Sequence, residues 1–125
     1  MAEPRMQLGA EWFCGDLPGV QEHLVHIERL GVSILYTTPF FPSRSNHRYN
    51  ATSFDEVDPL LGGDEALASL VRAAHARGIR VVGDLTINHI GDDHGWFTSA
   101  REDAEAPERG FFWFDERLPH GYEAW

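Results

Sequence analysis

The sequence predicts a repeating β/α fold, in which amphipathic helices alternate with parallel strands. Two stretches of the chain follow one plan: a helix with apolar residues on one face ends at a glycine and leads directly into a short apolar strand. The composition agrees with a globular domain, because 42% of the 125 residues are hydrophobic and 24% are charged. A chain of this length can therefore enclose one core.

The first unit is expected to begin at Asp16, whose carboxylate can cap a helix, and to stop at Gly31. A strand is predicted directly afterwards, at residues 32–36. The apolar face of this helix is formed by Val20, Leu24, Ile27 and Leu30.

The second unit repeats the plan, with Asp64 as the expected cap, Gly78 as the stop and a strand at residues 79–82. Both strands are apolar without alternation, which predicts parallel strands buried on both faces. The apolar face of the second helix is formed by Leu67, Leu70, Val71 and Ala74.

Functional residues of such folds gather where the parallel strands end, because the loops converge there. Residues 36–41 follow the first strand, and residues 84–89 follow the second. A connection of unusual length, residues 42–62, lies between the two units and has prolines at both ends. We expect this connection to be functional, because long loops in compact domains usually are.

The charge and the cysteine content exclude several classes of protein. The net charge of −10 repels phosphate backbones, so no nucleic acid is expected as a partner. Neither a signal peptide nor a membrane span is visible, which predicts no membrane association and a cytoplasmic location. The single cysteine, Cys14, excludes an internal disulfide and is expected to be structural.

The polar cluster after the second strand offers several roles. Asp84 is either a working carboxylate or an anchor for an arginine, because an unpaired buried carboxylate is costly. The amide oxygen of Asn88 suits calcium, although the residue can equally cap a loop. His89 can donate to a substrate hydroxyl or act as an acid or base, and the alternative is a packed loop histidine.

Three further polar residues follow, Asp92, Asp93 and His94, and they are expected to lie in a solvated connection. Together with His89 they form the basis of a competing hypothesis, a metal-dependent hydrolase, but their spacing matches no strong zinc pattern. In the long connection, His47, Arg48 and Tyr49 supply a stacking ring and hydrogen-bond donors, which are ingredients of a carbohydrate site.

Four segments follow one another along the chain: GDLPGVQEHLVHIERLGVSILYTTPFFPS, SNHRYNATSF, VDPLLGG and GIRVVGDLTINH. The last segment contains Asp84-x-x-x-Asn88-His89, the most specific element of the series. In this order, over residues 15–97, the sequence resembles the catalytic barrel of the alpha-amylase superfamily of glycoside hydrolases, in its neopullulanase, cyclomaltodextrinase and alpha-glucosidase branch, where this motif lies at the end of the third barrel strand.

The resemblance implies an α/β fold that is a partial (β/α)8 TIM barrel, comprising about strands 2 to 3 with their helices. It divides the chain into a lead-in at 1–14, the partial barrel at 15–90 and the start of an inserted subdomain at 91–125. A flavodoxin-like domain is the alternative fold, but it would need about five strands, and only two are evident.

The same resemblance implies the roles of the site residues. Asp84 would support the floor of the site, while His89 hydrogen bonds and Tyr49 stacks on the same sugar. Asn88 would lie at a calcium site, and no other cofactor is required. Asn50 stands where the family commonly has Asp, which removes one charge. With His47, these residues are expected to bind an alpha-glucan oligosaccharide of the maltodextrin, cyclomaltodextrin or pullulan type.

The retaining mechanism of this family uses a carboxylate nucleophile, a general acid and a third carboxylate, all after later strands. No G-x-R-x-D segment occurs in the chain. We therefore expect the chain to be a fragment that is inactive by itself. The alternative is a non-catalytic sugar-binding or structural module that retains part of the barrel.

Overall fold

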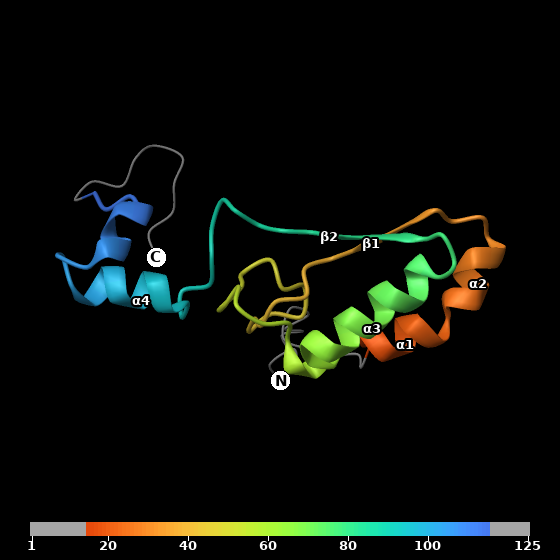
Figure 1. The fold of residues 1–125 in the computed structure, drawn as a ribbon. Helices are drawn as coiled ribbons and strands as arrows, with labels where there is room; N and C mark the ends of the chain where they lie inside the picture. Colours follow the sequence, from red (N-terminus) through yellow and green to blue (C-terminus); the bar gives the residue numbers. More distant parts are fainter. Residues whose placement is uncertain (1–14, 116–125) are drawn as a thin grey trace, which may run out of the picture.

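Two parallel strands, β1 (Ile34–Thr37) and β2 (Arg80–Gly83), form the sheet of the protein, whose computed structural model describes residues 15–115 (Figure 1). Their register places Ile34 opposite Arg80 and Thr37 opposite Gly83. This arrangement confirms the predicted parallel pair. Cys14 lies outside the described residues, so its structural role stays a prediction.

The first predicted helix is two short helices, α1 (Leu17–Glu22) and α2 (Leu24–Arg29). Asp16 caps α1 as predicted, because Gly19 N–H donates to Asp16 Oδ1 over 2.7 Å. The break falls at His23, whose ring Nδ1 donates to the Gly19 carbonyl over 2.8 Å. A side chain that bonds a carbonyl of its own helix competes with the backbone ladder, and this accounts for the interruption.

The second predicted helix, α3 (Gly63–His75), is continuous, but the expected cap at Asp64 is wrong. The cap is Gly62, two residues before Asp64, and Gly62 adopts φ 102°, a conformation that favours glycine. The Asp64 carboxylate instead accepts a hydrogen bond of 2.8 Å from Val57 N–H and fastens the long connection to the helix. Gly78 ends the unit with φ 70°, as the predicted stop requires.

Helices α1 and α3 pack against each other, and the helical layer lies on one side of the strands (Figure 1). Leu35 and Val81 point from the two strands towards this layer. Since side chains alternate along a strand, their neighbours must point to the other face. The buried residues of the core are Leu17, Leu24, Val57, Leu70, Ala74 and Ile79.

The expectation that the strands are buried on both faces is wrong for the described part of the chain. Ile34 is 44% exposed, Tyr36 is 60% exposed and Val82 is 43% exposed. The physical reason is that α1, α2 and α3 lie on one side of β1 and β2, while the helix at residues 95–102 lies beyond the end of the strands (Figure 1). None of the described helices therefore covers the second face.

The long connection is ordered without being regular. It contains an antiparallel bridge between Ser43 and Ala51 and a 3-10 turn, η2 (Pro59–Leu61), whose first N–H groups are capped by Asp58. The chain after β2 joins it, because Gly91 N–H donates to Ala51 O over 2.8 Å. Two loops that are remote in sequence are thereby held side by side.

Beyond this junction lie α4 (Gly95–Glu102) and the 3-10 turn η3 (Pro107–Phe111), which pack on each other. Arg109 Nη1 donates to Ala100 O over 2.6 Å and ties the two together. The predicted boundary near residue 90 stays a prediction. None of the helices within residues 15–115 is long and apolar enough to cross a membrane.

Candidate functional site at the carboxyl edge of the strands

A phenol and a carboxylate from different loops meet where the strands end. Asp84 follows β2, and its N–H donates to Thr37 O over 3.0 Å, which extends the strand pairing by one residue. Tyr49 arrives from the long connection, and its Oη donates to Asp84 Oδ2 over 2.6 Å. The fold thus joins two of the predicted site residues, which lie far apart in the sequence.

The hydrogen bond to Tyr49 is the largest influence on Asp84 and lowers the pKa of its carboxyl group. Hydrogen bonds from Tyr36 and from Leu85 N–H lower the same pKa further, while partial desolvation opposes them. The carboxylate in turn raises the pKa of both phenols, chiefly through the hydrogen bonds they donate. At neutral pH the group is therefore one anion held by two neutral donors.

Two alternatives were left open for Asp84, a working carboxylate and an anchor for an arginine, and these contacts favour the working carboxylate. Within the described residues its side chain bonds to tyrosines, and no arginine forms an ion pair with it. Tyr36 is a site residue that the sequence reasoning missed. Its position could have indicated it, because Tyr36 follows Leu35 directly on β1 and successive side chains of a strand point to opposite faces.

A second polar group lies in the loop just before and after Tyr49. Ser43 Oγ donates towards Asn50, at 2.9 Å from Oδ1 and 3.0 Å from the backbone oxygen. Ser45 Oγ also donates to Asn50 Oδ1. Tyr49 N–H donates to His47 Nδ1 over 3.1 Å. Ser45 Oγ also lies 3.2 Å from His47 Nδ1. The predicted residues His47 and Asn50 therefore belong to one network, together with two serines that the sequence did not single out.

Arg48 anchors this loop through a buried ion pair. It is only 7% exposed, and its Nε lies 2.9 Å from Oδ2 of Asp58, which is 4% exposed. Its backbone has φ 59°, a conformation that is unfavourable for a residue with a side chain. The ion pair therefore holds a strained turn, and His47 and Tyr49 flank that turn.

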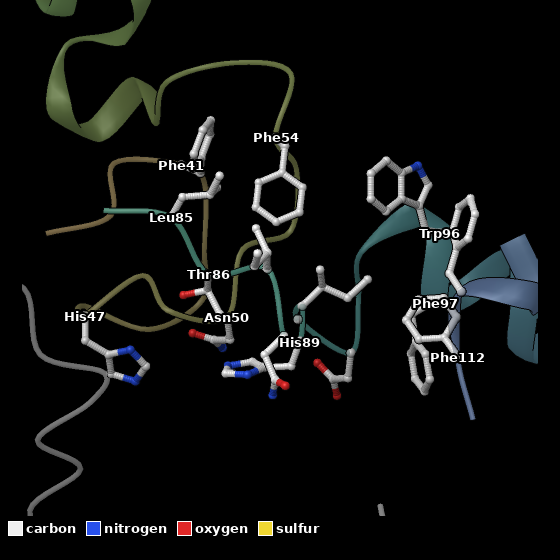
Figure 2. Close-up of a pocket in the computed structure, with 16 residues that line it drawn as sticks. Phe41, His47, Asn50, Phe54, Leu85, Thr86, His89, Trp96, Phe97 and Phe112 are labelled. Carbon is white, nitrogen blue, oxygen red and sulfur yellow. The ribbon is translucent and has the colours of Figure 1, made fainter. Parts of the chain in front are cut away.

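An open hollow of about 1150 Å³ lies beside the pair of Asp84 and Tyr49 and is lined by the other predicted residues. Figure 2 shows polar side chains along one part of it and aromatic rings along another. Asp84 and Tyr49 do not line this hollow, so the predicted set divides into two neighbouring groups. The polar lining is His47, Asn50, Thr86, Asn88, His89 and Asp92.

The aromatic part of the lining comes from the long connection and from the segment after Ile90. Phe54 and Trp96 lie with ring centroids 6.0 Å apart, and Trp96 meets Phe111 edge to face at 5.6 Å. Phe54 and Trp96 were not singled out from the sequence. Their grouping depends on the contact between two loops, which no local pattern encodes.

The expectation that His94 lies in a solvated connection is wrong. It is 5% exposed, its Nδ1 accepts from Trp96 N–H over 3.1 Å to cap α4, and its ring lies 5.5 Å from that of Phe54. Burial lowers the pKa of this imidazole, against the opposing charges of Asp55 and Asp93. Asp93 forms an ion pair with Arg44, whereas Asp92 is exposed as expected.

The competing metal-dependent hydrolase finds no support in this geometry. Residues 15–115 contain no group of three or more histidine, cysteine, aspartate or glutamate side chains placed to hold a metal ion. Asn88 is exposed and offers one neutral oxygen, which falls short of the six to eight oxygen ligands that calcium takes. Calcium at Asn88 stays a prediction.

Parallel β/α units with polar and aromatic side chains at the carboxyl edge define a class, the α/β proteins that bind their ligands at that edge. The family model described as alpha amylase, catalytic domain, matches residues 5–123, and the chain belongs to this family. The predicted resemblance and the partial barrel fold are thereby confirmed.

Individual relatives agree with this assignment. Alpha-amylase SusG of Bacteroides thetaiotaomicron is 40% identical over 102 residues, which cover 82% of this chain and 15% of the relative. A cyclomaltodextrinase of Geobacillus thermopakistaniensis is 39% identical over 106 residues, covering 85% and 18%. The crystal structure of an alpha-amylase from H. orenii superposes with a TM-score of 0.78 at 35% identity, covering 83% and 23%. The chain thus spans less than a quarter of each of these proteins.

Proposed function

We propose that residues 15–115 form the substrate-binding edge of an enzyme that acts on alpha-glucosidic bonds of maltodextrin, cyclomaltodextrin or pullulan-type glucans. The observation that carries the proposal is the 2.6 Å bond between Tyr49 and Asp84, which fixes a stacking ring beside the hollow lined by His47 and His89. Family membership and the names of relatives such as cyclomaltodextrinase support the substrate class.

In this proposal the chain binds and orients a sugar, and the reacting carboxylates are supplied from outside it. A retaining glycosidase needs two carboxyl groups about 5–5.5 Å apart on either side of the scissile bond. Asp84 accepts hydrogen bonds from two phenols, and its pKa is lowered, so it is poorly suited to act as the general acid, which must donate a proton. Asp92 and Asp93 lie in the connection after Ile90, and Asp93 is paired with Arg44.

The experiment is to incubate purified chain 1–125 with maltotriose and to measure release of reducing sugar. We expect no release above the buffer control, and turnover by the chain alone would contradict the placement of the catalytic carboxylates outside it. A longer polypeptide of the same reading frame that contains a G-x-R-x-D segment should release reducing sugar.

A second candidate is a non-catalytic sugar-binding module, and it is favoured by the fact that the described residues supply both polar and aromatic side chains to the lining of the hollow. The exposed second face of β1 and β2 favours the enzyme instead, because an isolated module would have to expose Ile34, Tyr36 and Val82 to water. Titration with maltodextrins separates the two. Micromolar binding that requires Tyr49 would support the module, and its absence would support the enzyme. A cytoplasmic location stays a prediction for either.

A further inference from the structure

His94 is a buried polar side chain with a partner for only one of its two ring nitrogens. It is 5% exposed, and the other buried polar residues of the described chain, Arg48 and Asp58, pair with each other. Trp96 N–H donates to His94 Nδ1 over 3.1 Å, whereas Nε2 is enclosed and has no hydrogen-bond partner within residues 15–115. Buried polar atoms are nearly always hydrogen bonded, so an exception needs a physical explanation.

The one hydrogen bond of this imidazole places its proton. A backbone N–H can only donate, so Nδ1 must be the unprotonated nitrogen, and in the neutral ring the proton resides on Nε2. Burial disfavours the charged ring and lowers the pKa of His94, against the charges of Asp55 and Asp93. His94 is therefore a neutral side chain with one acceptor in use and one buried donor that no described residue accepts.

Two contacts of the same ring explain why a polar side chain lies here. Nδ1 caps the first turn of α4, and the ring centroid lies 4.7 Å from that of Trp96 and 5.5 Å from that of Phe54. An asparagine would keep the cap, because its side-chain oxygen is bonded to Cγ as Nδ1 is in histidine, but it has no ring. A phenylalanine would keep a ring and lose the acceptor. Histidine combines the two, and the unpartnered Nε2–H accompanies that combination.

The two rings that His94 contacts belong to the hollow, although His94 itself does not line it. Phe54 comes from the long connection and Trp96 from the first turn of α4, and Figure 2 shows both rings in the lining. Their centroids lie 6.0 Å apart, and the ring of His94 contacts both. His94 is thus placed to hold two parts of the aromatic lining that come from different loops.

The other contacts at this junction do not hold the rings. Arg44 forms an ion pair with Asp93, but 71% of the arginine side chain is exposed, and exposed pairs contribute little. Gly91 N–H donates to Ala51 O and fixes the backbone three residues before His94. The main packing partner of α4 among the described helices and strands is η3, so the junction with the long connection sets where α4 begins.

We infer that His94 is a positioning residue for the glucan site, which holds Phe54 and Trp96 in the lining of the hollow and needs both its ring and its Nδ1 acceptor to do so. The inference rests on the proposed function for the identity of the ligand, but the placement of the two rings does not. His94 acts only through these neighbours and touches no sugar.

The test uses chain 1–125 labelled with carbon-13 and nitrogen-15, maltotriose up to millimolar concentration, and the variants His94→Asn and His94→Phe. His94→Asn removes the ring and keeps the cap, whereas His94→Phe keeps a ring and removes the cap. The control is His75→Asn, the same exchange at an exposed histidine of α3 that does not line the hollow.

The measurements without ligand concern the tautomer and the rings. At neutral pH, the nitrogen-15 shifts of His94 should show an unprotonated Nδ1 and a protonated Nε2. Nuclear Overhauser contacts between the rings of Phe54 and Trp96 should be present in the original chain and in His75→Asn, and lost in His94→Asn. A proton on Nδ1, or ring contacts that persist in His94→Asn, would overturn the positioning role.

In the titration we expect each His94 variant to weaken maltotriose binding about three- to tenfold, as the loss of one ring contact or one cap predicts, and His75→Asn to change it less than twofold. Unchanged affinity in His94→Asn would mean that the cap suffices, and in His94→Phe that the ring suffices. Either result overturns the inference and leaves the proposed function intact.

If His94→Phe does not fold, the comparison of His94→Asn with His75→Asn decides. If maltotriose moves no signal of residues 54, 89 or 96 in the original chain, the proposed function fails, while the ring contacts measured without ligand still decide whether His94 positions Phe54 and Trp96.

Discussion

Replacing Arg48 by methionine should destabilise the protein far more than the same replacement of an exposed arginine. The Arg48 Nε and Asp58 Oδ2 atoms lie 2.9 Å apart, and the two residues are 7% and 4% exposed. Methionine keeps an unbranched apolar stem and a Cβ, so the strain at φ 59° is unchanged. What the variant loses is the charge that compensates a buried carboxylate.

The magnitude follows from the burial of the pair. Removing one partner of a buried ion pair costs about 3–5 kcal/mol, because the other charge is left without compensation. The matched control is Arg72→Met, whose partner Glu65 lies 3.0 Å away and whose pair has side chains 65% and 86% exposed. An exposed pair of this kind contributes about 0–1 kcal/mol. The two variants should therefore differ by at least about 2 kcal/mol.

The assay is urea denaturation of chain 1–125 at pH 7, followed by far-ultraviolet circular dichroism, with the free energy of unfolding as the result. If Arg48→Met is too unstable to fold, the double variant Arg48→Met with Asp58→Asn should regain stability, since no buried charge then remains. An equal loss in Arg48→Met and Arg72→Met would refute the reasoning. So would a double variant that is no more stable than Arg48→Met alone.

Two further predictions concern the strand ends. Gly83→Ala should cost about 1–3 kcal/mol through overpacking, because a Cβ there would overlap Phe40 Cε1. Gly95→Ala is the control, since a Cβ at that position meets no atom within 4 Å. The two variants are compared by thermal melting, and equal melting temperatures would contradict the prediction. Tyr49→Phe should raise the pKa of Asp84 towards its usual range, and Tyr36→Phe should raise it less, as measured by carbon-13 titration of the carboxyl signal. Since the folded-state pKa of Asp84 is depressed, its contribution to stability is present above the unfolded pKa and is lost as the pH falls through the folded pKa. The stability difference between Tyr49→Phe and the original chain should accordingly disappear in acid, and a difference that persists there would count against the hydrogen bond as its cause.

Local patterns predicted the elements well where the signal was local. Asp16 as a cap and Gly31 and Gly78 as stops depend on the conformations and hydrogen bonds of adjacent residues, and the structure has all three. The prediction of a cap at Asp64 was wrong because the two glycines before it allow the helix to start earlier, and because the Asp64 carboxylate accepts a hydrogen bond from Val57 N–H instead. His94 failed because its burial depends on Phe54, which lies forty residues earlier in the chain.

The sequence by itself determined that the chain contains two β/α units, that the strands are parallel and that Asp84, Asn88 and His89 follow the second strand, because periodicity and turn residues act over a few positions. Only the tertiary structure decided which of the predicted residues meet. It joined Tyr49 to Asp84, set His47 and Asn50 beside His89, and buried Arg48 against Asp58. The reason is that these pairings depend on how the long connection folds back onto the strand ends. Its partners there are remote in the sequence, so a pattern of neighbouring residues cannot predict them.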